Sequence, residues 1–269
     1  MANVGVNGVS LYCEIQGTGP SVVLVHGSWG DADGWARVAP GLAERCTVVS
    51  YDRRGHSRSE DPPSQGSVHE DVADLAGLIE VLDLGPAFVC GNSYGSLITL
   101  RLAASRPELL RGIAVHEPPG IELLRDDPDL RPIVEGITMG QGPVRALLEA
   151  GESAAAAELF VDTIAFGPGA WAQFPAPLRH TFITNAPTYL DELRDPDAFD
   201  LDLVALRRFT DPVLLTHSDD TAPMFALALE RIGRSLPQAE HHLYASAGHM
   251  PHVSQAEEYI RVTLPRALE

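Results

Sequence analysis

The stretch with the clearest chemical potential is Gly91-Asn92-Ser93-Tyr94-Gly95, which has the form G-x-S-x-G. An apolar run, Phe88–Cys90, leads into it, and a helical pattern of leucine, isoleucine and alanine leaves it. A hydroxyl on so sharp a turn needs neighbours without side chains, because the helix packs back onto the strand. The pattern predicts a nucleophile elbow, with Ser93 at the carboxyl end of a central strand and the amide of Tyr94 beside it.

A serine hydroxyl is a poor nucleophile at neutral pH, so this chemistry requires partners. It needs an adjacent base, and the base must itself be oriented by a third group. The oxyanion that forms needs two preorganised donors, of which the amide of Tyr94 is one. Because the chain has ten histidines, the base has to be chosen by its place in the fold.

Strand patterns alternate with helical patterns on both sides of the elbow. Several runs are continuously apolar, as expected for parallel strands covered on both faces. Strands alternating with helices predict a doubly wound, mostly parallel α/β sheet. The predicted strands are Val9–Gln16, Ser21–His26, Thr47–Tyr51, the run that enters the elbow, Gly112–His116, Val213–Thr216 and His241–Ala245.

From about residue 121 to residue 210 the buried-strand pattern disappears. Helical pieces punctuated by proline and glycine replace it, at Val144–Ala150, Ala154–Ile164, Leu178–Asn185 and Thr188–Leu193. We therefore expect residues 1–120 and 211–269 to form the core, and residues 121–210 to form a helical lid inserted after the sixth strand.

Composition narrows the class of protein. The net charge of −18 and the pI near 4.8 argue against nucleic acid or an anionic membrane as a partner. The three cysteines lie in or beside predicted strands, which indicates buried residues of a reduced protein. No signal peptide or membrane span is evident. We expect a cytoplasmic monomer or homodimer that acts on a small molecule.

The sequence suggests no cofactor. The histidines lack metal-ligand spacing with carboxylates or cysteines, so no metal site is predicted. The run Gly17-Thr18-Gly19-Pro20 precedes a strand, whereas a phosphate-binding loop lies between a strand and a helix.

Four motifs, taken in order, resemble those of the α/β-hydrolase superfamily of serine hydrolases, and of its esterases and lactonases in particular. They are His26-Gly27 after a core strand, Tyr51-Asp52-Arg53-Arg54-Gly55-His56-Ser57, the elbow, and Ala247-Gly248-His249-Met250-Pro251-His252. The nucleophile precedes the histidine, which is the family's order. The resemblance implies Ser93 as the nucleophile and His249 as the base, with His252 lining or capping the site.

The resemblance leaves two positions for the orienting acid. The commoner one follows the seventh strand, where Asp219 and Asp220 are adjacent and the spacing favours Asp220. The other follows the sixth strand, where Glu117 stands before a Pro-Pro corner. That arrangement is similar to lactone hydrolases of the zearalenone-hydrolase type and to haloalkane dehalogenases with a glutamate at this point. A rigidly held carboxylate suits an orienter, and we favour Glu117 over Asp220.

The His26-Gly27 loop should supply the second oxyanion donor. We expect this to be the amide of Ser28, with Trp29 as the near alternative and its side chain as a wall of the pocket. His26 is expected to brace the loop, and Arg53 and Arg54 to pair with the acidic surface. The candidates for the substrate pocket are Trp29, Trp171, Phe182 and Tyr189.

The hypothesis for function is a serine hydrolase that cleaves an uncharged, moderately hydrophobic carboxylic ester or lactone through an acyl-enzyme. The same residues could serve hydrolysis of carbon–carbon bonds or cofactor-free peroxidation. A further alternative is a non-hydrolytic binding protein or cyclase that uses only the lidded pocket, because fold alone does not fix function.

Overall fold

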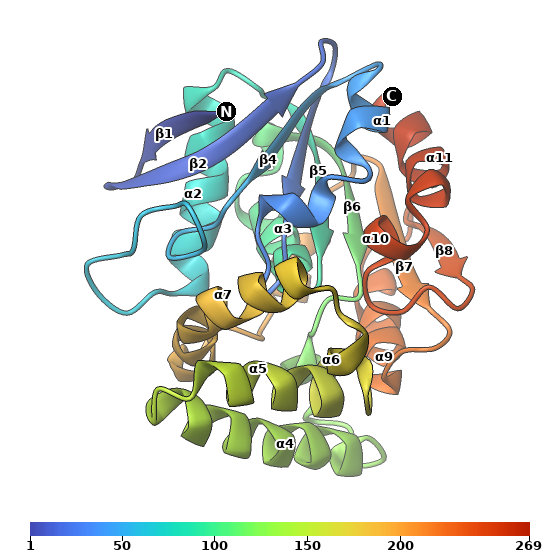
Figure 1. Cartoon of the computed structure of the whole chain (residues 1–269). Helices are drawn as coiled ribbons and strands as arrows, with labels where there is room; N and C mark the ends of the chain where they lie inside the picture. The colour runs from blue at the N-terminus through green and yellow to red at the C-terminus, as the bar shows by residue number, and fades with distance from the viewer.

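An eight-stranded sheet forms the centre of the computed structural model, which describes all 269 residues (Figure 1). The strand order is β1-β2-β4-β3-β5-β6-β7-β8. Pairing is antiparallel between β1 and β2 and between β2 and β4, and parallel everywhere else. The strands are β1 Ala2–Val6, β2 Val9–Gln16, β3 Ser21–Val25, β4 Thr47–Tyr51, β5 Ala87–Asn92, β6 Leu110–His116, β7 Val213–Ser218 and β8 Glu240–Tyr244.

The doubly wound, mostly parallel architecture predicted from the apolar runs is confirmed. Strand β1 is the one strand the sequence analysis missed, and it completes the hairpin with β2 at the edge of the sheet. Its exposed residues alternate with buried Val4 and Val6, which is the half-buried pattern of an edge strand.

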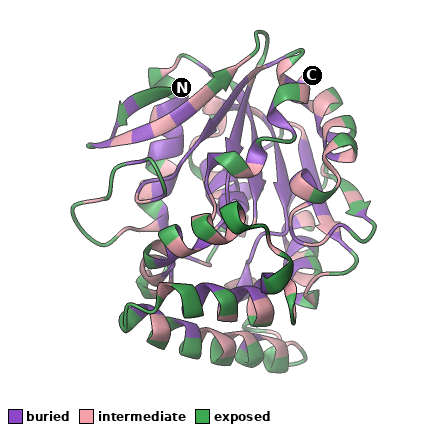
Figure 2. Cartoon of the chain, in the orientation of Figure 1, coloured by how far each residue is buried: buried purple, intermediate pink, exposed green.

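Helices cover both faces of the sheet, which explains the continuously apolar strands. On β3, Val22 and Leu24 contribute to one hydrophobic cluster, while Val23 and Val25 contribute to another on the opposite face, because successive strand residues point to opposite sides. Buried residues fill the central strands (Figure 2). The helices that flank the sheet are α1 Ala39–Ala43, α2 Val68–Val81, α3 Tyr94–Ser105, α8 Leu203–Leu206, α9 Pro223–Gly233, α10 Pro251–Ser254 and α11 Ala256–Ala267.

The insertion between β6 and β7 is helical, and most of it forms a separate layer. Its main helices are α4 Arg131–Glu149, α5 Ser153–Phe160, α6 Ala170–Gln173 and α7 Ala176–Arg194. They share a third hydrophobic cluster of twelve buried residues, and the chain after α5 continues as one π-helical turn. In Figure 1 this layer lies below the sheet, across the ends of the strands.

Two details of the insertion differ from the sequence analysis. The expected helices Leu178–Asn185 and Thr188–Leu193 are one helix, α7, with Pro187 inside it. The segment after α7 does not belong to the separate layer. Its residues Ala198, Leu206 and Phe209 pack instead into the hydrophobic cluster of 35 buried residues that also contains Val23 and Val25 of β3. The helical layer therefore ends earlier than residue 210.

No helix in the structure combines the length and the apolar character needed to cross a membrane.

The small residues of the elbow can be tested through stability. A Cβ at Gly95 would lie 2.3 Å from the carbonyl oxygen of Val25 and 2.6 Å from that of His26, so Gly95→Ala must force α3 away from β3. We expect the free energy of unfolding to fall by about 3 kcal/mol, measured by urea denaturation.

Gly136→Ala is the matched control. Gly136 lies in α4 with no atom within 4 Å of the added Cβ, so the better helix propensity of alanine should raise the free energy of unfolding by about 0.5–1 kcal/mol. Equal effects of the two substitutions would contradict the close approach of α3 to β3.

Candidate active site

Ser93 lies at the turn between β5 and α3 in a strained backbone conformation. Its φ and ψ angles are 53° and −121°, a region that residues with side chains rarely adopt. The strain is sustained by the surrounding backbone: the amide of Ser93 donates to the carbonyl of His116 at 2.8 Å, and a Cβ at Gly91 would lie 2.5 Å from the carbonyl oxygen of Gly95. The turn directs the serine out of the sheet, as the elbow pattern predicts.

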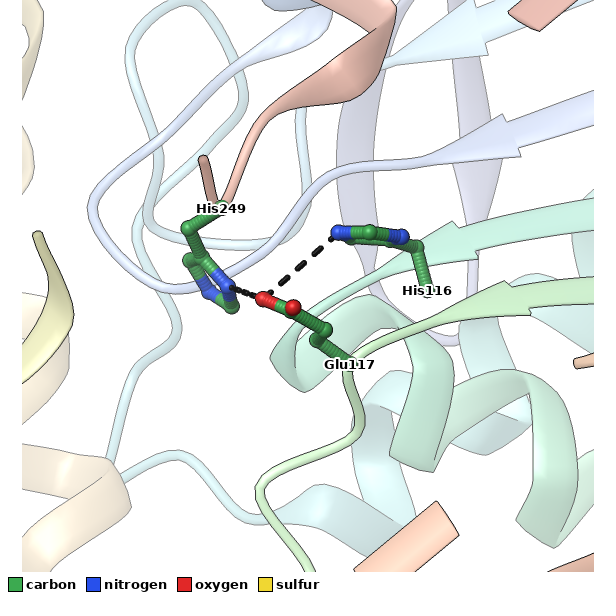
Figure 3. A group of neighbouring side chains, drawn as sticks. All are labelled: His116, Glu117 and His249. Atoms are coloured by element: carbon green, nitrogen blue, oxygen red, sulfur yellow. Dashed lines mark hydrogen bonds and ion pairs between the residues drawn. The ribbon is translucent and has the colours of Figure 1, made fainter. Parts of the chain in front are cut away.

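Glu117 follows β6, and its carboxylate contacts the side chain of His249, which lies in the loop after β8. The distance between Oε2 of Glu117 and Nδ1 of His249 is 2.5 Å (Figure 3). A carboxylate accepts only if Nδ1 carries the proton, which leaves Nε2 of the imidazole as an acceptor. Both side chains are buried. This geometry is that of a base oriented by an acid.

Every oxygen of the Glu117 carboxylate has a donor. Its Oε1 accepts from the amide of Ser218 at 2.8 Å and from the hydroxyl of Thr221 at 2.5 Å. Burial acts to raise the pKa of Glu117, but the neighbouring imidazoles of His116 and His249 outweigh it and lower the pKa below its usual value. The carboxylate therefore stays ionised and can stabilise a positive charge on the base.

His116 is a second imidazole beside the same carboxylate. Its Nε2 lies 3.5 Å from Oε2 of Glu117, and its Nδ1 lies 2.9 Å from the hydroxyl of Thr216. Burial lowers the pKa of His116. His116, Glu117 and His249 are the one group in the chain whose ligand atoms are close enough to hold a metal ion. The hydrogen bonds of Glu117 and of Nδ1 of His116 already account for their arrangement.

Asp220, the other candidate acid, lies elsewhere. It is exposed, and its carboxylate accepts from the amide of Gly248 at 2.9 Å. Asp219 accepts in the same way from the amide of Ser246 at 2.7 Å. The two aspartates thus brace the turn that carries His249, whereas the imidazole itself is bonded to Glu117.

Ser93 and His249 line one pocket under the helical layer. The side-chain amide of Asn92 donates to the carbonyl of His249 at 3.0 Å, which holds the two loops together. The His249 ring stacks on Phe225 of α9 at 4.5 Å and meets Phe166 edge-on at 5.7 Å. No hydrogen bond joins the Ser93 hydroxyl to the ring, and catalytic hydrogen bonds commonly tighten only when substrate binds.

The loop after β3 packs directly against the nucleophile. A Cβ at Gly27 would lie 2.9 Å from the Cβ of Ser93, so only glycine fits there. Ser28 lines the pocket beside Ser93. His26 braces the loop, because its Nε2 accepts from the amide of Arg53 at 2.9 Å. The backbone of Ser28 is therefore close to the reacting hydroxyl.

The expected pocket residues divide into two groups. Phe182 lines the pocket, together with Phe160, Phe166 and Leu178 from the same helical layer. The side chain of Trp29 does not form a pocket wall: it is buried in the layer, where its ring lies 4.9 Å from that of Phe160 and 5.0 Å from that of Tyr189. Trp171 and Tyr189 belong to the same hydrophobic cluster.

The paired arginines are buried, which corrects the expectation that they meet the acidic surface. Arg53 binds Asp71 at 2.9 Å and Glu192 at 3.1 Å, and Arg54 binds Asp74 at 2.7 Å. A buried charge must be paired, and both arginines follow the end of β4, while Asp71 and Asp74 lie on α2. The arginine pair therefore joins the end of β4 to α2.

The sequence analysis missed two polar residues near the site, Asp31 and Glu192, whereas a third, His252, lines the pocket as expected. Asp31 is buried, lines the pocket and accepts from the hydroxyl of Ser57 at 2.9 Å. Glu192 accepts from the hydroxyl of Ser28 at 2.5 Å. His252 lines the pocket with its ring 4.2 Å from that of Trp35, and burial lowers its pKa to about 3. Glu192 carried no sequence signal, since it lies inside the helical insertion, where the sequence contains no recognised motif.

The comparison with known families decides the assignment. Residues 22–262 match the model described as the alpha/beta hydrolase family. The chain belongs to this family. The match spans the elbow, the Glu117–His249 pair and the helical insertion, so Ser93 and His249 both lie within the region that the family model covers.

Among curated relatives, the hydrolase is 40% identical over 123 residues to the uncharacterized hydrolase YraK of Bacillus subtilis, covering 44% of this chain and 45% of that protein. It is 36% identical over 105 residues to a pyrrolizixenacetamide deacetylase of Xenorhabdus hominickii, covering 39% of each chain. These alignments span less than half the length of the curated relatives.

Among solved structures, an alpha/beta hydrolase of Sphaerobacter thermophilus is 27% identical, with a TM-score of 0.78 over 97% of this chain and 100% of that chain. The enol-lactonase of Burkholderia xenovorans superposes with a TM-score of 0.81 over the whole of both chains at 21% identity. The second likeness shows the fold alone.

The buried Glu192 predicts how stability depends on pH. Burial raises the pKa of Glu192 to about 7, with Arg53 and Ser28 offsetting part of the effect. The folded protein therefore holds this proton up to about pH 7, whereas the unfolded chain releases it near pH 4.3. Between these values the group's contribution to the free energy of unfolding falls as pH rises, by at most about 1.4 kcal/mol per pH unit.

Glu192→Gln removes this titration. Its free energy of unfolding relative to wild type should therefore increase from pH 5 to pH 8, as measured by urea denaturation at each pH. Glu158→Gln, on an exposed face of α5, is the control and should give a flat difference. A flat difference for Glu192→Gln would show that Glu192 is already ionised at pH 5.

Proposed function

We propose that this alpha/beta hydrolase is a serine hydrolase that cleaves an uncharged carboxylic ester or lactone through an acyl-enzyme. The observation that carries the proposal is the 2.5 Å contact between Glu117 and Nδ1 of His249, in the pocket that Ser93 also lines. That contact leaves Nε2 of the imidazole as the available base beside a strained serine.

In the first half of the reaction, the Ser93 hydroxyl attacks the substrate carbonyl while Nε2 of His249 takes its proton. The amides of Tyr94 and Ser28 hold the oxyanion. When the intermediate collapses, the carbon–oxygen bond to the leaving group breaks and His249 donates its proton to the departing alcohol. Glu117 stays ionised throughout and stabilises the imidazolium.

In the second half, His249 takes a proton from water as the water oxygen attacks the acyl carbon. The bond to Ser93 then breaks, and the proton returns from His249 to the serine oxygen. The products are the carboxylic acid and the alcohol, or a single hydroxy acid when the substrate is a lactone.

The pocket supports a small, apolar acyl group. Its volume is about 60 Å³, and Phe160, Ala165, Phe166, Leu178 and Phe182 supply apolar walls from the helical layer. The charged side chains nearby are engaged: Asp31 accepts from the amide of Asp33 at 3.1 Å as well as from Ser57. A substrate with its own charge would have no free partner in this pocket.

The roles of the three catalytic residues predict a kinetic pattern on an aryl acetate. Ser93→Ala and Glu117→Gln should each lower kcat by about 10⁴-fold or more, since a misoriented base is nearly as damaging as a missing nucleophile. Asp220→Asn, which changes a carboxylate bonded to the backbone of Gly248, should stay within a few-fold of wild type.

Initial rates and mass spectrometry after reaction with a fluorophosphonate give the measurement, with an adduct expected on Ser93 alone. A large loss in Asp220→Asn together with a small one in Glu117→Gln would reverse the choice of acid. Wild-type protein that forms no adduct and turns over no ester would refute the proposed function.

The pocket size predicts a preference for short acyl chains. Among p-nitrophenyl esters, kcat/KM should be highest for acetate or butyrate and fall for octanoate, because about 60 Å³ accommodates only a few methylene groups. Phe182→Ala enlarges the pocket and should move the optimum to longer chains, whereas Trp171→Phe, in the layer's core, should leave the order unchanged. An unaltered optimum in Phe182→Ala would exclude this wall as the acyl site.

A further inference from the structure

Helix α7 contacts the loop after β3, which packs against Ser93. Glu192, in the last turn of α7, is buried, and its Oε2 accepts from the hydroxyl of Ser28 at 2.5 Å. The two residues are 164 positions apart in the chain. This contact links the helical insertion to the residue whose amide is proposed as an oxyanion donor.

The other carboxylate oxygen of Glu192 is held by Arg53. The guanidinium donates to Oε1 at 3.1 and 3.2 Å. Arg53 also engages the loop itself, because its backbone amide donates to His26 and its guanidinium reaches the carbonyl of Gly27 at 3.5 Å. Residues 26–28 are therefore held by Arg53 and by Glu192, which are also bonded to each other.

The charges show that Glu192 is more than a partner for Arg53. Asp71 already balances the charge of the guanidinium, with hydrogen bonds of 2.9 and 3.0 Å. A second buried carboxylate on the same cation costs free energy through desolvation and repulsion. Glu192 adds what the Arg53–Asp71 pair does not supply, which is an acceptor for Nη1 of Arg53 and for the hydroxyl of Ser28.

Small movements of this loop matter because it packs closely against the elbow. The site of a Cβ on Gly27 lies 2.9 Å from the Cβ of Ser93. An oxyanion donor must lie about 2.7–3.1 Å from the developing charge, so a shift of an ångström would remove the amide of Ser28 from range.

We propose that Glu192 is a positioning residue for the reaction. From helix α7 it holds the hydroxyl of Ser28, and through it sets the backbone of residues 26–28 so that the amide of Ser28 faces the oxyanion. The oxyanion donor thus depends on the position of the helical insertion. This inference rests on the proposed function of Ser93.

A double-mutant cycle tests the proposal, with kcat and KM on an aryl acetate and the rate of fluorophosphonate labelling at Ser93 as readouts. Ser28→Ala keeps the amide and removes the hydroxyl, and Glu192→Ala removes its acceptor. Each should lower kcat and the labelling rate by about 10-fold, part of the ~10²–10³-fold lost when a donor is removed outright. KM should change little, because the donor acts in the transition state.

Two further variants separate positioning from general stability. The double variant Ser28→Ala/Glu192→Ala should be no slower than the slower single variant, since both changes break one contact. Glu192→Gln keeps an acceptor oxygen and should recover most of the rate. Asp191→Asn is the matched control: its carboxylate accepts from the amide of Gly66, away from Ser28, and its rates should equal those of wild type.

The outcomes are distinct. Multiplicative losses in the double variant, a change confined to KM, or no recovery in Glu192→Gln would each overturn the positioning role. Wild-type protein that is not labelled at Ser93 would instead overturn the proposed function, and the inference with it. If Glu192→Ala does not fold, Ser28→Ala against Ser28→Ala/Glu192→Gln gives the same comparison, with equal rates expected and a further loss contradicting the proposal.

Discussion

The burial of one carboxylate, that of Glu117, constrains the whole catalytic side of the molecule. An ionised carboxylate can remain out of water only when donors surround it. Here the donors come from three segments: the end of β7, the turn before α9, and the loop after β8. These segments must meet at the end of β6. The same requirement fixes the imidazole of His249 next to the elbow, because no other position satisfies Glu117.

A second buried charge, Arg53, organises the opposite side of Ser93. It sits at the end of β4 and binds Asp71 of α2 and Glu192 of α7, so the sheet, a flanking helix and the helical insertion converge on one guanidinium. The two networks differ in balance. The ionised Glu117 is matched by donors on both oxygens, whereas Arg53 serves two carboxylates, and burial raises the pKa of the second one, Glu192.

How much of the fold and of the site could be predicted depends on whether the residues that determine each feature are close together in the sequence. The elbow is a local pattern, and its glycines lie where backbone atoms would collide with a Cβ, so five residues sufficed to predict its geometry. The apolar runs predicted the central strands for a similar reason, since each strand is covered on both faces. The edge strand β1 was missed because it has only two buried valines, too few for a periodic signal.

The choice of acid, and the contacts of the insertion, depend on residues far apart in the sequence. Both Glu117 and Asp220 follow buried strands of the sheet, so spacing alone left both open until the bond to His249 was seen. Glu192 and the aromatic rings around Trp29 had no local pattern at all: a tryptophan beside a glycine loop predicts a pocket wall as readily as a buried anchor. A tryptophan at this position becomes a buried anchor only if the insertion packs its hydrophobic core around it, and that core exists only in the folded protein.

The insertion is attached to the site by contacts of two kinds. Trp29 enters the hydrophobic cluster of the helical layer, an attachment that tolerates small shifts because apolar contacts are not directional. Ser28, the preceding residue, is held by a hydrogen bond to Glu192, which is directional and short. The side chain of Trp29 anchors the loop, and the hydroxyl of Ser28 aligns it, so together they can keep the backbone amide of Ser28 in place. The helices that hold the loop nevertheless lie in the part of the chain whose structure is least determined by local sequence.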